Sequence, residues 1–321
     1  MNRFQRIALT AFVCLEVLIF VGALVRATGS GLGVPDWPKC YGRYFPPSSA
    51  ADIDFAKLDL VKFKAAAVRH GRDPDTITEA NLRAEFDPVA TWIEYINRLT
   101  SLPLGISVLV LLIAAFRQRQ RVVLVSSIAA FVLLILNGWI GATVVLSALQ
   151  PVRISLHMGL AILMLFVLVF TAWRGRDDPW RFDTSHPARK LAAALLFLVL
   201  IEGFMGSQVR QLTDSLARTH AGHPRIEWVG ELEQSWVYLL HRSFSWLIVG
   251  TAMLFYRQAL RTTWLERSIV GLVFAQMLLG VVLSQVGVLA IAQILHIGLS
   301  SLLVSALGLW LLAARRSKVA S

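Results

Sequence analysis

The chain has 321 residues, of which 56% are hydrophobic and only 16% are charged, and its mean hydropathy is +0.63. A soluble protein of this size cannot bury that much apolar surface in one core, so these values exclude an ordinary soluble fold and favour a membrane protein. The net charge of +11 alone would suggest a nucleic-acid partner, but the placement of the basic residues excludes that class.

Eight apolar segments follow one another along the chain, and each is long enough to cross a bilayer as a helix. They lie at 7–27, 91–115, 122–146, 152–173, 190–210, 236–256, 267–286 and 290–313. No small-residue cleavage site precedes Arg26, so the first segment is expected to belong to the mature fold. The sequence therefore predicts an all-α integral membrane protein with eight transmembrane helices.

The basic residues set the expected orientation. If the N-terminus lies inside, the inner segments hold most of the arginines, whereas the outer turns near 147–151 and 287–289 hold none. This asymmetry predicts that both termini are cytoplasmic. The long outer loop, about 29–90, contains an amphipathic stretch from Ile53 to Val68, which is interpreted either as a helix on the membrane surface or as a solvated loop helix. The two cysteines, Cys14 and Cys40, differ too much in depth to predict a disulfide.

Two halves of the sequence resemble each other. Residues 94–99 match 238–243, and residues 155–160 match 294–299, with offsets of 144 and 139 residues. Each half holds four spans, so both enter the membrane in the same direction and form a parallel repeat. The expected architecture is two four-helix bundles, one from residues 1–173 with the loop 29–90 and one from residues 174–321.

Three of the seven histidines lie inside spans, namely His157, His241 and His296, each about 5–6 residues beyond the outer start of its helix. An ionisable group inside a span marks a functional site more often than not, and the alternative is a hydrogen bond between helices. Two imidazoles facing each other across a bundle suit haem iron, whereas zinc, copper or non-haem iron would need more ligands at this level. The other four are interpreted as solvated loop residues: His70, His186, His220 and His223.

The two predicted haem sites differ. The C-terminal half has the pair His241 and His296, which predicts a six-coordinate haem b suited to electron transfer. The N-terminal half has His157, but Asn97 stands where the repeat predicts histidine, so a haem there would keep an open face. Glu94 lies three residues before Asn97, on the same helical face, and is a candidate proton relay; the alternative is an ion-pair partner of a neighbouring arginine.

Five arginines stand at outer helix ends, against the inward bias of the other basic residues. Haem propionates at the outer interface would explain them through charge-assisted hydrogen bonds, and the alternative is that some pair with acids or snorkel. They are Arg26, Arg98, Arg153, Arg210 and Arg242.

The chain resembles the haem A synthase family in residues 22–32 (GALVRATGSGL), 35–42 (PDWPKCYG), 94–98 and 141–145, and in the contexts of the three span histidines. The resemblance implies oxidation of the C8 methyl group of haem O to the formyl group of haem A in a bacterial inner membrane, with the haems toward the outer face. It implies Glu94 as catalytic residue and His157 as a ligand of the substrate haem, and we assign Asn97, Arg98, Arg26 and Arg153 to the same site from their positions. It also implies a haem b cofactor held by His241, His296, Arg242 and Arg210.

The partners implied by this resemblance are haem O, membrane lipid, a haem O synthase (farnesyltransferase) and an electron-transfer partner. A homo-oligomer is compatible with the sequence, and no nucleic-acid partner is expected. Two departures from the family pattern are Asn97 in place of histidine and Val34 in place of the first loop cysteine, with Cys40 as the second. The first alternative function is a haem-b electron-transfer protein linked to quinol. The second is a transporter, suggested by the repeat and by polar span residues that are otherwise explained by interhelical hydrogen bonds: Glu16, Asn137, Glu202 and Gln276.

Overall fold

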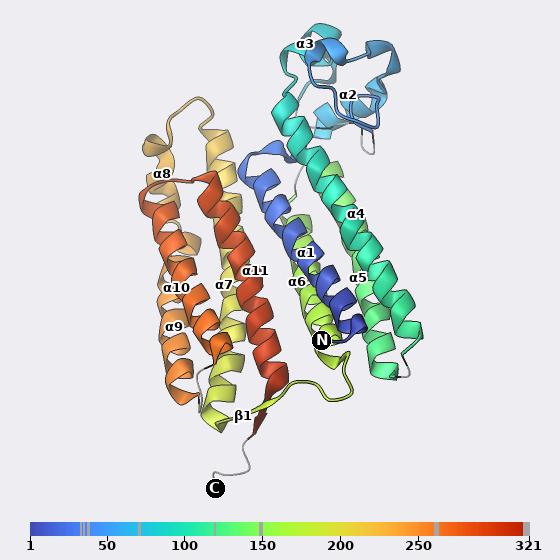
Figure 1. The fold of residues 1–321 in the computed structure, drawn as a ribbon. Helices are drawn as coiled ribbons and strands as arrows, with labels where there is room; N and C mark the ends of the chain where they lie inside the picture. The colour runs from blue at the N-terminus through green and yellow to red at the C-terminus, as the bar shows by residue number, and fades with distance from the viewer. Residues whose placement is uncertain are drawn as a thin grey trace.

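The computed structural model describes residues 1–32, 34, 36, 39–69, 72–118, 120–147, 150–259 and 263–316, and within them eight helices are long and apolar enough to cross a membrane (Figure 1). They confirm the all-α membrane class and the predicted spans. Their bounds are α1 Arg3–Ala27, α4 Pro88–Phe116, α5 Arg121–Leu146, α6 Pro151–Arg174, α7 His186–Thr219, α9 Trp236–Gln258, α10 Trp264–Gln285 and α11 Ala290–Ala313.

Polar side chains cap several of these helices at their first turn. The side chain of Asp87 accepts a hydrogen bond from the Ala90 amide at the start of α4, and Thr263 and Glu266 form a reciprocal cap on α10. Helix α7 runs to Thr219, well past the predicted end at 210, because hydropathy marks where the apolar surface ends and not where the hydrogen-bonded helix ends.

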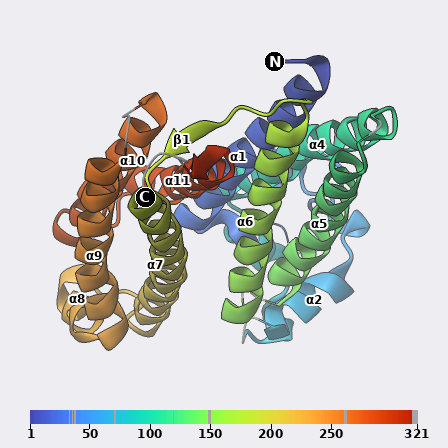
Figure 2. The same ribbon diagram turned by 90° about the horizontal axis from the view of Figure 1, so that it is seen from below.

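The eight helices pack around two separate apolar cores (Figures 1 and 2). Helices α1, α4, α5 and α6 enclose one, with Leu111 and Leu165 fully buried, and α7, α9, α10 and α11 enclose the other, with Phe255 and Trp310 fully buried. Each core is the apolar side of four helices facing one another, and the remaining apolar side chains face outward, as expected for helices surrounded by lipid.

The two bundles meet along α1 and α11, which lie side by side in Figure 1. The carboxylate of Glu16 in α1 accepts hydrogen bonds from Ser301 (2.5 Å) and Ser305 (3.3 Å) in α11. The ring of Phe20 lies against Gly298, where a Cβ atom would be only 2.2 Å from Phe20 Cζ. Glu16 is therefore one of the predicted interhelical hydrogen-bonding groups, and it joins the two halves.

The outer loop folds around a small core of its own at the outer end of α4 (Figure 1). The prediction of one helix from Ile53 to Val68 was wrong: a 3-10 turn, η3 Phe55–Lys57, is capped by Asp54, and α2 Leu60–Arg69 follows it. The chain bends between them because Leu58 and Phe63 turn into the loop core. The remaining short elements are η1 Ser30–Leu32, η2 Ala50–Asp52, η4 Pro74–Thr76 and α3 Glu79–Ala84; His70 lies outside the described residues.

At the opposite end, the linker between the halves contains β1 Phe182–Thr184, which pairs in parallel with β2 Ala314–Arg316 after α11 (Figure 2). A short helix, α8 Arg225–Gln234, lies between α7 and α9. The linker is thereby fastened to the end of the C-terminal bundle.

Candidate functional site

The three span histidines stand at one level of the molecule. His157, His241 and His296 follow the first residues of α6, α9 and α11 by six, five and six positions, and these helices begin at the same end of the bundles (Figure 1). At about 1.5 Å per residue, each imidazole is attached roughly 8–9 Å from that end.

Each imidazole lies against a glycine of a neighbouring helix. A Cβ atom on Gly141 of α5 would be 3.1 Å from Cε1 of His157, and one on Gly206 of α7 would be 3.2 Å from Cε1 of His241. A Cβ atom on Gly280 of α10 would be 3.9 Å from Cε1 of His296. At Gly141 and Gly206 a Cβ atom would crowd the ring, whereas at Gly280 it would make an ordinary contact; in each place the ring lies against the helix backbone, and we call this arrangement a cradle.

Asn97 occupies the fourth such position. Its Oδ1 atom would be 3.9 Å from a Cβ atom on Gly22 of α1, so the same helix-to-helix arrangement recurs with an amide in place of an imidazole. Within the described residues this buried Oδ1 accepts no hydrogen bond. The repeat therefore places four equivalent cradles in the molecule, of which three hold histidine.

A carboxylate holds the ring of His241. Its Nδ1 atom is 3.2 Å from Oε1 of Glu202, one turn before Gly206 in α7, and Ser245 donates a hydrogen bond of 2.5 Å to the same oxygen. A carboxylate on one imidazole nitrogen fixes the ring and directs the other nitrogen, Nε2, toward a metal. Glu202 therefore has a more specific role, beside His241, than the general interhelical hydrogen bond that the sequence predicted.

The other two imidazoles meet backbone carbonyls at the corresponding places. His157 contacts the carbonyl of Asn137, and His296 contacts that of Gln276, in both cases one turn before the cradle glycine. None of the three Nδ1 atoms, that of His241 beside Glu202 included, makes a full hydrogen bond within the described residues. His296 also lies close enough to His241 for the two rings to interact electrostatically.

Glu94 is almost completely buried in α4, with 3% of its surface exposed, and forms an ion pair with Arg98 one turn later. The Nη1 atom of Arg98 also donates to the carbonyl of Lys39 at 3.3 Å. The ion pair that the sequence offered as the alternative role of Glu94 is therefore present. It does not exclude proton transfer, because the pair fixes the carboxyl one turn from Asn97.

The outer loop reaches this ion pair through a tight turn. Asp36 accepts hydrogen bonds from the amides of Tyr41 (2.9 Å) and Gly42 (2.6 Å), and Gly42 has a φ of +76° in a place where a Cβ atom would be 2.8 Å from the carbonyl of Lys57. Part of the segment 35–42 thus has a structural role; its residues Pro35, Trp37 and Pro38 lie outside the described part of the chain.

Cys40 lies in the same turn and is a free thiol with 1% of its surface exposed. Burial raises the pKa of this thiol to about 12, with a smaller opposing effect of Arg98. The thiol is therefore protonated at neutral pH, and a protonated, buried thiol is a poor nucleophile.

Two of the five outer arginines meet at the boundary between the halves. The carboxylate of Asp214 forms ion pairs with Arg210 at 2.9 Å and with Arg26 at 3.5 Å. Arg210 also donates hydrogen bonds to the Arg26 carbonyl at 3.3 Å and to the side chain of Gln293. The Nε atoms of both arginines are buried without a hydrogen-bond partner among the described residues. These two donors remain for an anionic group.

The other two outer arginines have different contacts. Arg153 donates to the carbonyl of Thr143 at 3.1 Å, and the guanidinium of Arg242 lies 6.0 Å from the ring centroid of Tyr238. In the described part of the chain neither is paired with a carboxylate. The structure therefore separates the five arginines into three with acidic partners and two without.

These residues fit haem in both halves. The imidazoles are half-buried, each lies against a glycine of a neighbouring helix, and the unsatisfied arginine Nε atoms suit propionates. The C-terminal half offers two imidazoles and the N-terminal half offers one. His241 and His296 would be the iron ligands of a haem in the C-terminal half, and His157 alone would be the iron ligand of one in the N-terminal half.

The sequence did not reveal four features of the site. They are Glu202 as the partner of His241, Asp214 as the partner of Arg26 and Arg210, and the glycines Gly22 and Gly206 beside Asn97 and His241. The glycines could have been found, because each stands four residues before the arginine of a matched Val-Arg pair. Asp214 follows Arg210 by four residues, which is an ion-pair spacing on a helix, but the predicted span ended before it.

The sequence matches a known protein family and is similar to several named proteins. The family described as cytochrome oxidase assembly protein, COX15-CtaA, matches residues 5–307. Similar proteins named Heme A synthase include one from Granulibacter bethesdensis, 28% identical over 218 residues that cover 64% of this chain and 53% of the relative. Another, from Bacillus pumilus, is 27% identical over 270 residues, covering 75% and 71%. A third, from Staphylococcus aureus, is 24% identical over 248 residues, covering 75% and 69%. The match thus spans about half the length of the first relative.

Proposed function

The chain belongs to the cytochrome oxidase assembly protein family, and from that premise we propose that it is a haem A synthase, an oxidoreductase that converts the C8 methyl group of haem O to a formyl group. The observation that supports the proposal is the set of half-buried imidazoles beside glycines, two in the C-terminal half and one in the N-terminal half. A permanently bound electron-transfer haem and a haem with a free axial face are the two parts that such an oxidation needs.

In this proposal the C-terminal half binds haem b through His241 and His296. Haem b supplies one-electron transfer when bound. Glu202, beside Nδ1 of His241, would orient the ring and leave Nε2 free to bind iron, and Arg210 and Arg242 would bind the propionates.

The N-terminal half would bind haem O through His157, and Asn97, a neutral amide and a poor iron ligand, would leave the iron free to react. Arg26, Arg98 and Arg153 bind its propionates. Glu94 is the catalytic residue: its carboxyl, held by Arg98, moves a proton at the open face. The haems lie toward the outer face of a bacterial inner membrane, since the basic residues cluster at the other end.

The test is the conversion itself. The chain is expressed together with a farnesyltransferase that makes haem O, in cells that lack haem A, and the extracted haems are separated by chromatography. We expect haem A to appear. A folded, haem-loaded protein that yields haem O alone would contradict the proposal.

The asymmetry of the halves favours one other function. A chain with a complete ligand pair in one half and Asn97 in the other could be a haem b electron-transfer protein linked to quinol and to a redox partner. Reduction of the bound haem by a quinol in the absence of any haem A formation would support that alternative.

A further inference from the structure

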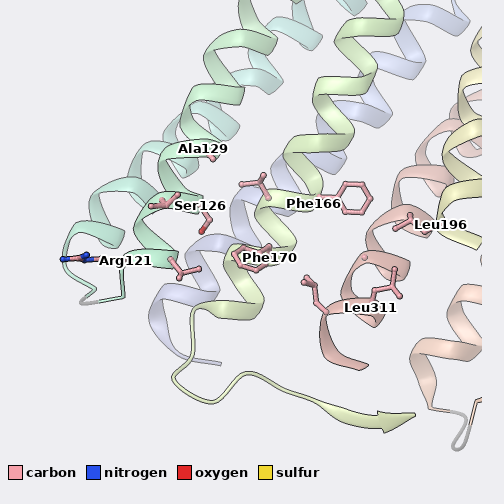
Figure 3. A pocket seen from close by; sticks show the side chains of 12 residues that line it. Arg121, Ser126, Ala129, Phe166, Phe170, Leu196 and Leu311 are labelled. Carbon is pink, nitrogen blue, oxygen red and sulfur yellow. The ribbon is translucent and has the colours of Figure 1, made fainter. Parts of the chain in front are cut away.

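An apolar cleft lies at the end of the membrane region opposite the histidines (Figure 3). It has a volume of about 700 Å³ and is formed by four helices: α5 and α6 of one half, and α7 and α11 of the other. Figure 3 shows Phe166 and Phe170 of α6 between Ala129 of α5 and Leu196 and Leu311. The cleft faces the space that lipid chains fill, and none of the groups assigned to haem lines it.

A second pocket, which is polar and has a volume of about 370 Å³, lies where the linker passes the end of α11. Three guanidinium groups line it, those of Arg176, Arg181 and Arg315, together with the carboxylate of Asp178. Within the described residues none of the three arginines is in salt-bridge distance of a carboxylate. The pocket therefore has an excess positive charge that the protein itself does not neutralise.

Trp173 joins the two cavities. Its ring is 6.3 Å from that of Phe170, which lines the cleft, and the guanidinium of Arg181, which lines the pocket, lies 5.5 Å from its centroid. The indole Nε1 atom donates to the carbonyl of Trp180 at 2.8 Å, which fixes the linker in place. The chain after α11 also connects the two cavities: Leu311, near the end of α11, lines the cleft, and Arg315, in β2, lines the pocket. Strand β2 pairs with β1 of the linker.

We propose that this face binds one anionic phospholipid of the inner leaflet, with its acyl chains in the cleft and its phosphate among Arg176, Arg181 and Arg315. An amphiphile is the chemistry that fits, because Trp173 contacts both Phe170 of the apolar cleft and Arg181 of the cationic pocket. Guanidinium groups bind phosphate oxygens in pairs, and Trp173 lies at the boundary where aromatic rings are favoured. An excess of positive charge favours an anionic lipid over a zwitterionic one.

The experiment uses the full-length protein, purified in detergent and then exposed to vesicles of phosphatidylglycerol or of phosphatidylcholine, with bound lipid measured by native mass spectrometry. We expect retention of phosphatidylglycerol. Retention should fall roughly tenfold, the effect of about 1.4 kcal/mol, when Arg176→Gln, Arg181→Gln and Arg315→Gln are combined. The matched control is Arg267→Gln, which removes an exposed basic residue of α10 outside both cavities.

A second variant tests the acyl-chain half. Ala129→Phe adds a large apolar side chain to the cleft without touching the charged pocket, so it should lower retention of long-chain phosphatidylglycerol and leave a dihexanoyl analogue unaffected. Inorganic phosphate serves as the probe for simple anion binding. Equal retention of both lipid classes, equal loss in the Arg267→Gln control, or full competition by inorganic phosphate would overturn the proposal. Gel filtration of each variant shows that it is folded.

Discussion

In the C-terminal half, α7 presents Glu202 and Gly206 to His241 of α9. In the N-terminal half, α1 presents Gly22 to Asn97 of α4, and Leu18 stands four residues before Gly22, the position that Glu202 has relative to Gly206. The glycine is kept in both, and the imidazole and its carboxylate are present in one only. The backbone arrangement around an iron ligand can therefore be kept when the ligand is lost. Both halves keep the helix packing at a glycine, and only the C-terminal half keeps a histidine that can bind iron at this position.

The largest expected effect is the loss of the C-terminal haem. The substitution His296→Ala would remove one of the two histidines proposed to bind this haem, so the low-spin absorption spectrum should disappear completely. The control is His220→Ala, which changes a histidine of the outer loop region. A low-spin spectrum unchanged in His296→Ala would refute the assignment of the pair.

The second effect concerns turnover and not binding. Glu94→Gln keeps the shape of the side chain but removes its proton-transfer ability, so haem A formation should slow by about 100- to 10,000-fold while haem content stays normal. Haem content is measured by the pyridine haemochrome spectrum. Full activity in Glu94→Gln would leave this residue with the structural ion pair alone.

The third prediction transplants the C-terminal pattern into the N-terminal half. Asn97→His should make the haem there more fully six-coordinate, and Asn97→His combined with Leu18→Glu should strengthen that change because the carboxylate orients the new ring. Magnetic circular dichroism or electron paramagnetic resonance measures the low-spin fraction. Leu18→Glu without the histidine is the control, and it should leave coordination unchanged. No gain of low-spin signal in the double variant would show that the halves are not equivalent in geometry.

The fourth is a shift in potential. In Glu202→Gln, His241 loses an acceptor that strengthens its donation to ferric iron, so the midpoint potential of the C-terminal haem should rise while its ligands remain. A tenfold change in relative ferric affinity corresponds to about 59 mV. Ser245→Ala, which removes only the neighbouring hydroxyl, should shift it less. A fall in potential in Glu202→Gln would contradict this positioning role.

The smallest effect is chemical and belongs to the outer loop, which only the N-terminal half has in this length. With Cys14 replaced by serine, Cys40 should react slowly with iodoacetamide at pH 8, and the rate should keep rising with pH because its pKa is raised to about 12 by burial. In denaturant the thiol regains an ordinary pKa of about 8.5, and the reaction should be fast. Equal rates in the folded and denatured protein would show that the thiol is not buried.

The spans, their number and the level of the histidines followed from the sequence, because hydropathy and helix geometry act over short stretches. The turn between η3 and α2 did not, since it depends on Leu58 and Phe63 meeting Tyr41 and Leu82 in the loop core. Contacts between distant helices were also out of reach. Glu202 could be recognised as polar and buried, but only the packing of α7 on α9 shows that it meets His241.

The hydrogen bonds of Glu16 with Ser301 and Ser305 join the first transmembrane helix to the last. During synthesis α1 enters the membrane long before α11 has left the ribosome, so its carboxyl group has to wait for its serine partners in or near the lipid. The boundary between the bundles can close only when the chain is almost complete. The order of biogenesis thus makes the arrival of α11, which also carries His296, the step that finishes the molecule.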